Sequence, residues 1–410
     1  MKIKGYTLIY TVVIMLILTI LCGLLFEFLI LEKRVSDSLE IQTQQCLDVE
    51  SGINIWANSN DDITEVHYKT FYLNHEKYTD TVTVKTYPWG IYQIISAKAH
   101  YGKFSCDKHL MVGVELMYSK AALILLSSRN ILNISEISFI NGNIHGDVSK
   151  IKYFSVPYSN KPRPKKNFIG TVVSQDPTII NIPYYHKLFD DLSNKEMLPD
   201  IIPDTLENSF GDSTKMFLCN DKFVQKKSLS GNIIIISKKS LFISKDNVLK
   251  DILIIAPEVT IESGFSGSLQ VIASDLINVE EDCSLLYPSS LVLASDTSNS
   301  ISKINISTNS TVSGSVIAFK NLANNPKNCI VRIETESTIN GQVITNGFVD
   351  IQGIIYGQTI CKKILVSNGS GTYENHLFDV TIDIDKLPKS FAGVKITNIN
   401  NKTKQIKWLW

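Results

Sequence analysis

The chain has 410 residues, with 40 Lys and Arg balanced by 40 Asp and Glu. Zero formal net charge excludes a generally basic nucleic-acid-binding protein and a protein with a dominant acidic tail. Hydrophobic residues make up 44% of the chain and charged residues 20%, which excludes a disordered chain and allows a sizeable core. Frequent Ile, Ser and Asn favour strands and turns over helices.

The N-terminal region predicts a membrane anchor. Tyr6–Phe26 contains no charged residue, and as a helix it would span about 31 Å, the thickness of a bilayer core. Lys2 and Lys4 precede it, which by the positive-inside rule predicts a cytoplasmic N-terminus and a periplasmic or extracellular bulk. A small-residue cleavage site is absent before Glu27, so a retained single-pass anchor (domain 1–30) is favoured over a removed signal peptide.

The residues Lys4-Gly5-Tyr6, followed by an apolar run, resemble the type IV prepilin motif. The resemblance implies peptidase processing between Gly5 and Tyr6 and a place in a pilus or secretion-type assembly. The sequence departs from that family at Tyr10, where a Glu is usual. An uncleaved signal-anchor is the alternative interpretation.

The helical pattern continues beyond the anchor as a one-sided stripe, with polar residues such as Asp48 between its members. The stripe consists of Val35, Leu39, Gln42, Cys46, Val49 and Ile53. This spacing predicts a helix that packs on the chain's own sheet, since the stripe is too short for a coiled coil. The turn-forming residues 58–62 predict the helix end.

Four strand-like runs separated by short turns follow the helix, at 65–73, 81–87, 91–100 and 104–117. They predict an antiparallel sheet that completes a small helix-plus-sheet module over residues 31–118. The order of these elements resembles that of pilins.

From residue 119 the sequence pattern changes to short aliphatic runs with central glycines. The pattern occurs at Ile140–Ile144, Val312–Val316, Ile339–Val343 and Ile351–Ile355, with a looser copy at Phe265–Leu269. It predicts stacked strands that bury a continuous core, as in a β-solenoid. This part resembles bactofilin-type and secreted right-handed parallel β-helices. A jelly roll or sandwich is the alternative.

The predicted fold class is therefore mainly β: a transmembrane and amphipathic helix, a small antiparallel sheet, then a right-handed parallel β-helix. Further expected boundaries are a first rung at 119–150, an insertion at 151–228, the main β-helix at 229–372, and a cap and tail at 373–410. The insertion contains the Pro- and Lys-rich loop 159–167 and the polar-aromatic stretch 184–194. Residues 398–410 are expected to be an exposed tail.

A search for catalytic or metal-binding patterns predicts no site. The seven cysteines lack a CxxC pair, and buried free thiols are favoured for them over disulfides. The seven histidines contain no HExxH, and phosphate-binding glycine motifs are absent. Glu280-Glu281-Asp282 is interpreted as a solvated turn, the basic residues Lys161, Arg163, Lys165 and Lys166 as a solvated loop, and Gly264–Gly267 as a strand corner.

These observations predict a non-enzymatic, membrane-anchored, exported protein with a structural or adhesive role in a surface assembly. Catalytic, cofactor and metal residues are predicted to be none, and Gly5 and Tyr6 are the only candidate site, for processing. Expected partners are the membrane, through residues 6–26, and pilin-like or self-assembly partners; nucleic acid is not expected, and carbohydrate is left open. The alternatives are a tethered carbohydrate-active β-helix enzyme, whose acids only stacking would bring together, and a self-polymerising scaffold.

Overall fold

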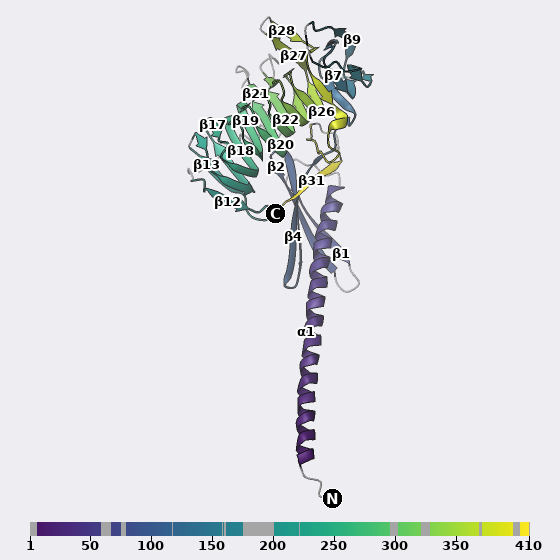
Figure 1. Ribbon diagram of the computed structural model, residues 1–410, viewed down its shortest axis with the longest axis vertical. Helices are drawn as coiled ribbons and strands as arrows, with labels where there is room; N and C mark the ends of the chain where they lie inside the picture. The colour runs from purple at the N-terminus through teal and green to yellow at the C-terminus, as the bar shows by residue number, and fades with distance from the viewer. Residues whose placement is uncertain are drawn as a thin grey trace. The chain divides into compact units, whose positions relative to one another are not determined.

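The computed structural model describes residues 6–58, 67–74, 79–116, 118–157, 159, 161–174, 201–220, 222–295, 302–320, 329–368, 371–396 and 402–409. The chain divides into two compact units. The first contains Met1–Ile55, Lys69–Val84 and Ala97–Lys108, and the second contains Trp56–Tyr68, Lys85–Ser96 and His109–Trp410. The structure is mainly β with one long N-terminal helix, as predicted (Figure 1).

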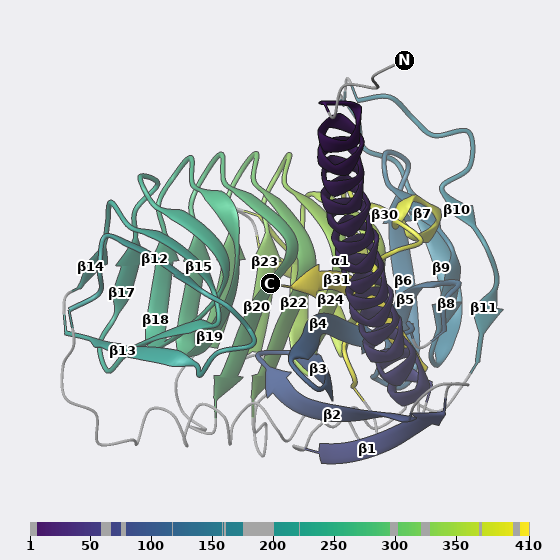
Figure 2. The ribbon, with the colours of Figure 1, turned by 90° about the horizontal axis from the view of Figure 1, so that it is seen from below.

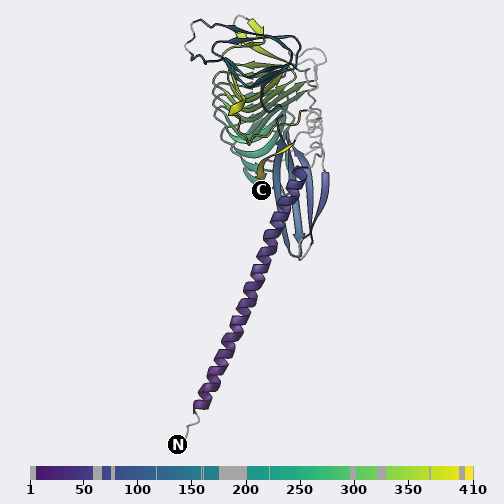
Figure 3. The ribbon, with the colours of Figure 1, turned by 90° about the vertical axis from the view of Figure 1, so that its right-hand side faces the viewer.

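Helix α1 runs without interruption from Tyr6 to Ala57, a length of 52 residues (Figure 3). Its end at Ala57 agrees with the turn-forming residues that begin at Asn58. At 1.5 Å per residue the helix is about 78 Å long, more than twice the thickness of a bilayer core.

A five-stranded sheet follows in the order β1-β2-β3-β4-β31. Its strands are β1 (His67–Asn74), β2 (Thr79–Trp89), β3 (Tyr92–Tyr101), β4 (Phe104–Val114) and β31 (Thr403–Leu409). The four consecutive strands confirm the predicted sheet. The prediction of an exposed C-terminal tail is wrong for β31, which pairs antiparallel with β4 and places Thr403 opposite Val114. Without β31, β4 would be the edge strand of this sheet, and its unpaired backbone groups are what Thr403–Leu409 pairs with.

The second unit contains a 23-stranded sheet. Its strands are β5 (Ala121–Leu125), β7 (Phe139–Asn141), β8 (Asn143–His145), β10 (Phe168–Ile169), β11 (Val172–Val173), β12 (Thr205–Asn208), β13 (Lys215–Cys219), β14 (Phe223–Val224), β15 (Ser228–Gly231), β16 (Ile233–Ser237), β17 (Leu241–Ile243), β18 (Val248–Ile261), β19 (Ser266–Val279), β20 (Ser284–Ser295), β21 (Ser302–Ile306), β22 (Thr311–Lys320), β23 (Cys329–Ile333), β24 (Thr338–Thr345), β25 (Phe348–Ile351), β26 (Ile354–Cys361), β27 (Lys363–Asn368), β28 (Gly371–Glu374) and β30 (Thr381–Asp383). A three-stranded sheet contains β29 (His376–Leu377), β6 (Asn130–Ser135) and β9 (Val148–Phe154), and a short 3₁₀ helix spans Ile384–Lys386.

The strands of this sheet lie side by side in the ribbon (Figure 2). Their parallel pairing in register stacks side chains at equivalent positions above one another. One column of paired, buried positions consists of Phe217, Ile235, Ile254, Val271, Leu291, Val316, Val343, Thr359, Leu123 and Ile144. Full burial of each aliphatic side chain in such a column contributes about 1.5–3 kcal/mol to folding. No single short strand could bury its apolar face alone, so the strands stabilise one another.

The order of strands in space departs from their order in the chain. β5, from the predicted first rung, lies between β8, which follows it closely in sequence, and the distant strand β26. β12, β13 and β14 lie within the predicted insertion, yet each pairs in parallel with a strand of the main stack. β10 and β11 also lie within the predicted insertion and pair in parallel with β7 and β8, so parallel strands occur on both sides of residue 229. The stretch 184–194 lies outside the described residues.

Glycines occur where neighbouring backbones approach most closely. Gly314 pairs with Ser289 on one side and with Gly341 on the other, and Gly341 in turn pairs with Gly357. Gly357, rather than the Gly353 of the sequence pattern, is thus equivalent to Gly341. Gly267 of the looser copy pairs with Leu285 and is not equivalent to Gly314 either. The pattern alone does not show which glycines pair, because pairing joins strands that are distant in the sequence.

Candidate functional site: the exposed helix and its disulfide-linked sheet

The predicted processing site lies at the start of α1. Tyr6 is the first residue of the helix, and Gly5 lies outside the described residues. Because the helix begins at Tyr6, the Gly5–Tyr6 bond lies at its N-terminal boundary.

The first half of α1 is apolar and uncovered. Every residue from Leu8 to Asp37 is exposed, including large side chains such as Leu16 (60%) and Phe26 (70%). Within the described residues, this helix alone is long and apolar enough to cross a membrane, with a mean hydropathy of 2.8 over its most apolar window. Exposing so many aliphatic side chains to water costs free energy, so they require an apolar environment.

Exposed apolar residues continue past Glu27, where the predicted span ends. Phe28, Ile30 and Val35 are between 47% and 63% exposed, and Leu39 is 56% exposed. The sequence placed Val35 and Leu39 on a stripe packed against the sheet, and that part of the prediction is wrong. The pattern of apolar residues is present, but the chain's own sheet begins to cover the helix only near Gln45.

The second half of α1 packs against the sheet within the first unit. Val49 and Ile53 are completely buried, which confirms this part of the predicted stripe. Gly52 faces Val82 of β2, and a Cβ added to Gly52 would lie 2.7 Å from a Val82 methyl carbon. The absence of a side chain therefore brings the helix close to the sheet. Asp48, predicted on the polar side, is only 3% exposed and accepts a hydrogen bond of 3.0 Å from Gln44.

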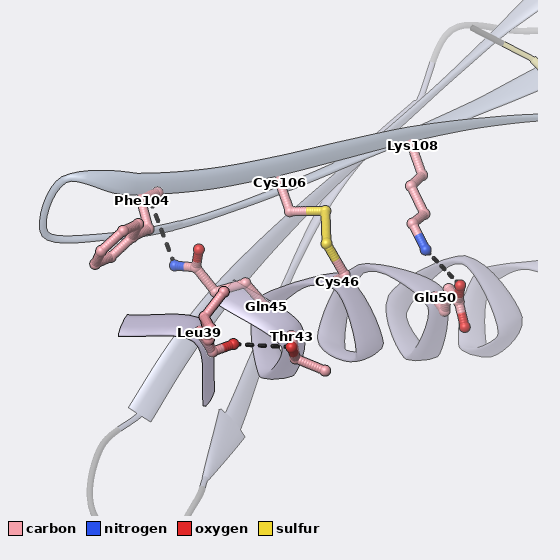
Figure 4. Close-up of a disulfide and its surroundings, with 8 residues drawn as sticks. All are labelled: Leu39, Thr43, Gln45, Cys46, Glu50, Phe104, Cys106 and Lys108. Atoms are coloured by element: carbon pink, nitrogen blue, oxygen red, sulfur yellow. Dashed lines mark hydrogen bonds and ion pairs between the residues drawn. A yellow bond between two sulfur atoms is a disulfide. The ribbon is translucent and has the colours of Figure 1, made fainter. Parts of the chain in front are cut away.

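A disulfide joins this part of the helix to β4. Cys46 and Cys106 are bonded across 60 residues of sequence, with 5.5 Å between their Cα atoms (Figure 4). Polar contacts flank it on both sides along the helix. Gln45 Nε2 donates to the carbonyl of Phe104 at 3.4 Å, and Lys108 forms an ion pair with Glu50. Helix and sheet are thus fixed at three successive points of β4.

The prediction of free thiols is confirmed for the other five cysteines and is wrong for Cys46 and Cys106. Cys219, Cys283, Cys329 and Cys361 are buried and free. Burial raises the pKa of the Cys329 thiol to about 11 and also raises that of Cys361, so these thiols lack the thiolate character of redox cysteines. The signal for the bonded pair was available, because Cys46 lies on the packed stripe and Cys106 on a strand of the same predicted module.

The acidic residues 280–282, interpreted from the sequence as a solvated turn, and the segment Gly264–Gly267, interpreted as a strand corner, each contain a turn in the structure. The acidic residues at 280–282 end in a turn in which Asp282 has φ +58° and accepts a hydrogen bond from Asn309. Among the described residues, no group of three His, Cys, Asp or Glu side chains is arranged to hold a metal ion. Gly264 (φ +81°) likewise forms a turn before β19, and Phe265 beside it is completely buried.

The basic loop is partly neutralised. Lys161 pairs with Asp379, and Arg163 lies 3.0 Å from the Glu136 carboxylate. Lys165 and Lys166 are exposed. Two of the four cations therefore face carboxylates of this chain.

Asp350 is the most deeply buried carboxylate in the described strands of the parallel stack, which also bury Asp251 and Asp383. It is 1% exposed and lies 3.1 Å from Arg332 on the neighbouring strand. Burial raises the pKa of Asp350, and the positive charge of Arg332 opposes that rise. The pairing of an acid with a cation on adjacent strands is a structural ion pair rather than the paired carboxylates of a glycosidase.

Comparison with known proteins adds little. No protein-family model and no curated protein matches the chain. One solved structure that matches is the competence-associated pilin ComZ from Thermus thermophilus, at 8% identity and a TM-score of 0.24, over 85% of this chain and 87% of that one. A TM-score so low supports no inference about fold or function, which must come from the residues themselves.

Proposed function

We propose that the chain is a non-enzymatic, membrane-anchored subunit of a pilus or secretion-type surface assembly, with a structural and adhesive role. Its N-terminus would be cytoplasmic and its bulk exported, and a prepilin-type peptidase would cut between Gly5 and Tyr6. The observation that carries the proposal is the apolar exposure of α1, which extends well beyond what a bilayer can cover.

The length of this exposed segment argues for protein partners as well as lipid. A bilayer core covers about 20 helical residues, which accounts for Tyr6–Phe26. Phe28, Leu31 and Leu39 then remain uncovered and face the surroundings beyond the span. Apolar helix surface outside the bilayer is stabilised by packing on neighbouring helices. Subunits whose helices bundle together provide such a surface.

The disulfide supports an exported location. Structural disulfides persist in oxidising compartments and are rare in the cytosol. Cys46 and Cys106 lie on the C-terminal side of the predicted span. Together with the lysines at positions 2 and 4, this supports a location of the disulfide on the side of the membrane opposite the N-terminus.

We further propose that the second unit is a right-handed β-helix that the assembly displays. Support comes from parallel pairing of successive strands, as in β18–β19, β20–β22 and β22–β24, with aliphatic columns between them. A jelly roll would need antiparallel pairs instead. The domain plan proposed is then an anchor, a helix-plus-sheet module and a β-helix, with 373–396 as a cap.

A substitution at the processing site tests the proposal in the native cell. We expect Gly5→Leu to block cleavage, because the peptidase motif requires the small residue before the cut. The wild-type protein should occur in the sheared surface fraction, and the variant should remain in the membrane fraction. Immunoblots of both fractions measure the distribution.

Gly23→Leu is the matched control, because Gly23 lies in the same apolar helix and nothing approaches its Cβ position within 4 Å. It should fractionate as the wild type does. Equal surface fractions for Gly5→Leu and the wild type would contradict the proposal, as would a wild-type protein confined to the membrane.

A further inference from the structure

A cavity of about 430 Å³ opens in the second unit beside the β27–β28 hairpin. Its volume falls within the range of small-molecule sites, about 300–1,000 Å³. Residues from separate parts of the sequence line it: Phe154, Gln352, Ser367, Tyr373, His376 and Phe378. Convergence of distant segments on one concave surface is a property of binding sites as well as of packing.

The strands fix the positions of these side chains. In the hairpin, Val366 lies opposite Tyr373 and Ser367 opposite Thr372. The pairing of β6 with both β29 and β9 brings His376 and Phe154 to the same region. Paired strands therefore hold Phe154, Ser367, Tyr373 and His376, whereas Gln352 and Phe378 directly follow the ends of β25 and β29.

The lining is dominated by aromatic rings, two of which are partly exposed. His376 lies between Phe154 and Tyr373, with ring-centroid distances of 5.9 and 5.7 Å. Tyr373 is 44% exposed and Phe378 is 38% exposed. Rings held at the mouth of a cavity, rather than buried, offer their faces to a ligand.

Among the described residues, no Lys, Arg, Asp or Glu side chain lines the cavity. The polar groups of the lining are the Gln352 amide, the Ser367 hydroxyl and the His376 ring. His376 Nδ1 lies 2.8 Å from the Glu374 carbonyl oxygen. A carbonyl can only accept, so Nδ1 carries a proton and donates it to this hydrogen bond.

We propose that this cavity binds a neutral carbohydrate of one or two pyranose rings. A pyranose has an apolar C–H face that matches an aromatic ring and a rim of hydroxyls that match the amide, hydroxyl and imidazole groups. A charged ligand would lose hydration without meeting an opposite charge among the lining side chains. The inference deepens the adhesive part of the proposed function by naming its ligand class.

The test uses full-length protein in detergent on an array of neutral and acidic oligosaccharides, with phosphocholine as an additional probe. We expect the wild type to bind neutral glycans. Tyr373→Ala and Phe378→Ala should each weaken the affinity for the best glycan about tenfold, the loss expected for one stacking contact. Tyr373→Phe should retain binding, because it keeps the ring.

Tyr153→Ala is the matched control, since Tyr153 is exposed on β9 next to Phe154 and points to the opposite side of the strand. It should bind as the wild type does. Failure to bind any neutral glycan, a preference for acidic glycans or phosphocholine, or undiminished binding by Tyr373→Ala would overturn the inference. Because the assay does not depend on processing at Gly5, its result is separable from that of the fractionation experiment.

Discussion

Replacing both Cys46 and Cys106 by Ser is expected to lower the free energy of unfolding of the helix–sheet unit by about 3–4 kcal/mol. The disulfide closes a loop of 60 residues, and closure of a loop of that size removes about 4 kcal/mol of chain entropy from the unfolded state. Helix α1 is the source of nearly all helical signal, so thermal unfolding followed by circular dichroism at the helical band measures the change. The midpoint should fall by more than about 10 °C.

Reduction of the wild-type protein should reproduce this loss, and the double variant should be insensitive to reductant. Cys22→Ser is the control, because Cys22 is exposed in the apolar half of α1 and is not disulfide-bonded. It should unfold as the wild type does and keep its sensitivity to reductant. A wild-type midpoint that reductant leaves unchanged would show that the bond does not stabilise this unit.

Gly314→Ala is expected to destabilise the parallel stack by about 3 kcal/mol or more. Gly314 has φ +148°, and a Cβ added there would lie 1.8 Å from the Ser289 carbonyl oxygen. Conformational strain of about 1–3 kcal/mol adds to overpacking of similar size. The clash is with backbone of the paired strand, so no side chain can rotate to relieve it. Urea unfolding followed by far-ultraviolet circular dichroism gives the free energy.

Gly371→Ala isolates the contribution of the close strand approach. Gly371 has nearly the same backbone angle, φ +155°, but nothing lies within 4 Å of its Cβ position. It should cost only the conformational part, about 1–2 kcal/mol. Equal losses for the two variants would mean that strand spacing in the stack does not depend on the glycine.

Much of the fold could be predicted because its signals are local. An uncharged apolar run, the turn residues after Ala57 and the alternation in the next four strands each depend on neighbours in sequence. The aliphatic–Gly pattern likewise indicated short strands before their pairing was known. The ends of these elements agree with the structure to within a few residues.

What the sequence could not give is which distant segments meet. The pairing of β31 with β4 and of β5 with β26 depends on free sheet edges, which no local pattern records. The same holds for the Cys46–Cys106 bond and for the aromatic cavity, whose lining spans residues 154 to 378. Val35 and Leu39 were predicted to pack on the sheet but are exposed. The helical periodicity of apolar residues is the same whether the stripe packs within the chain or is exposed, so the sequence could not distinguish the two cases.

The most direct test of the account is the N-terminus of the protein purified from its native membrane, determined by intact mass and N-terminal sequencing. A pilin-type assembly subunit should lack residues 1–5 and begin at Tyr6. A chain that begins at Met1 or Lys2 would contradict the account and leave a protein anchored by an uncleaved helix.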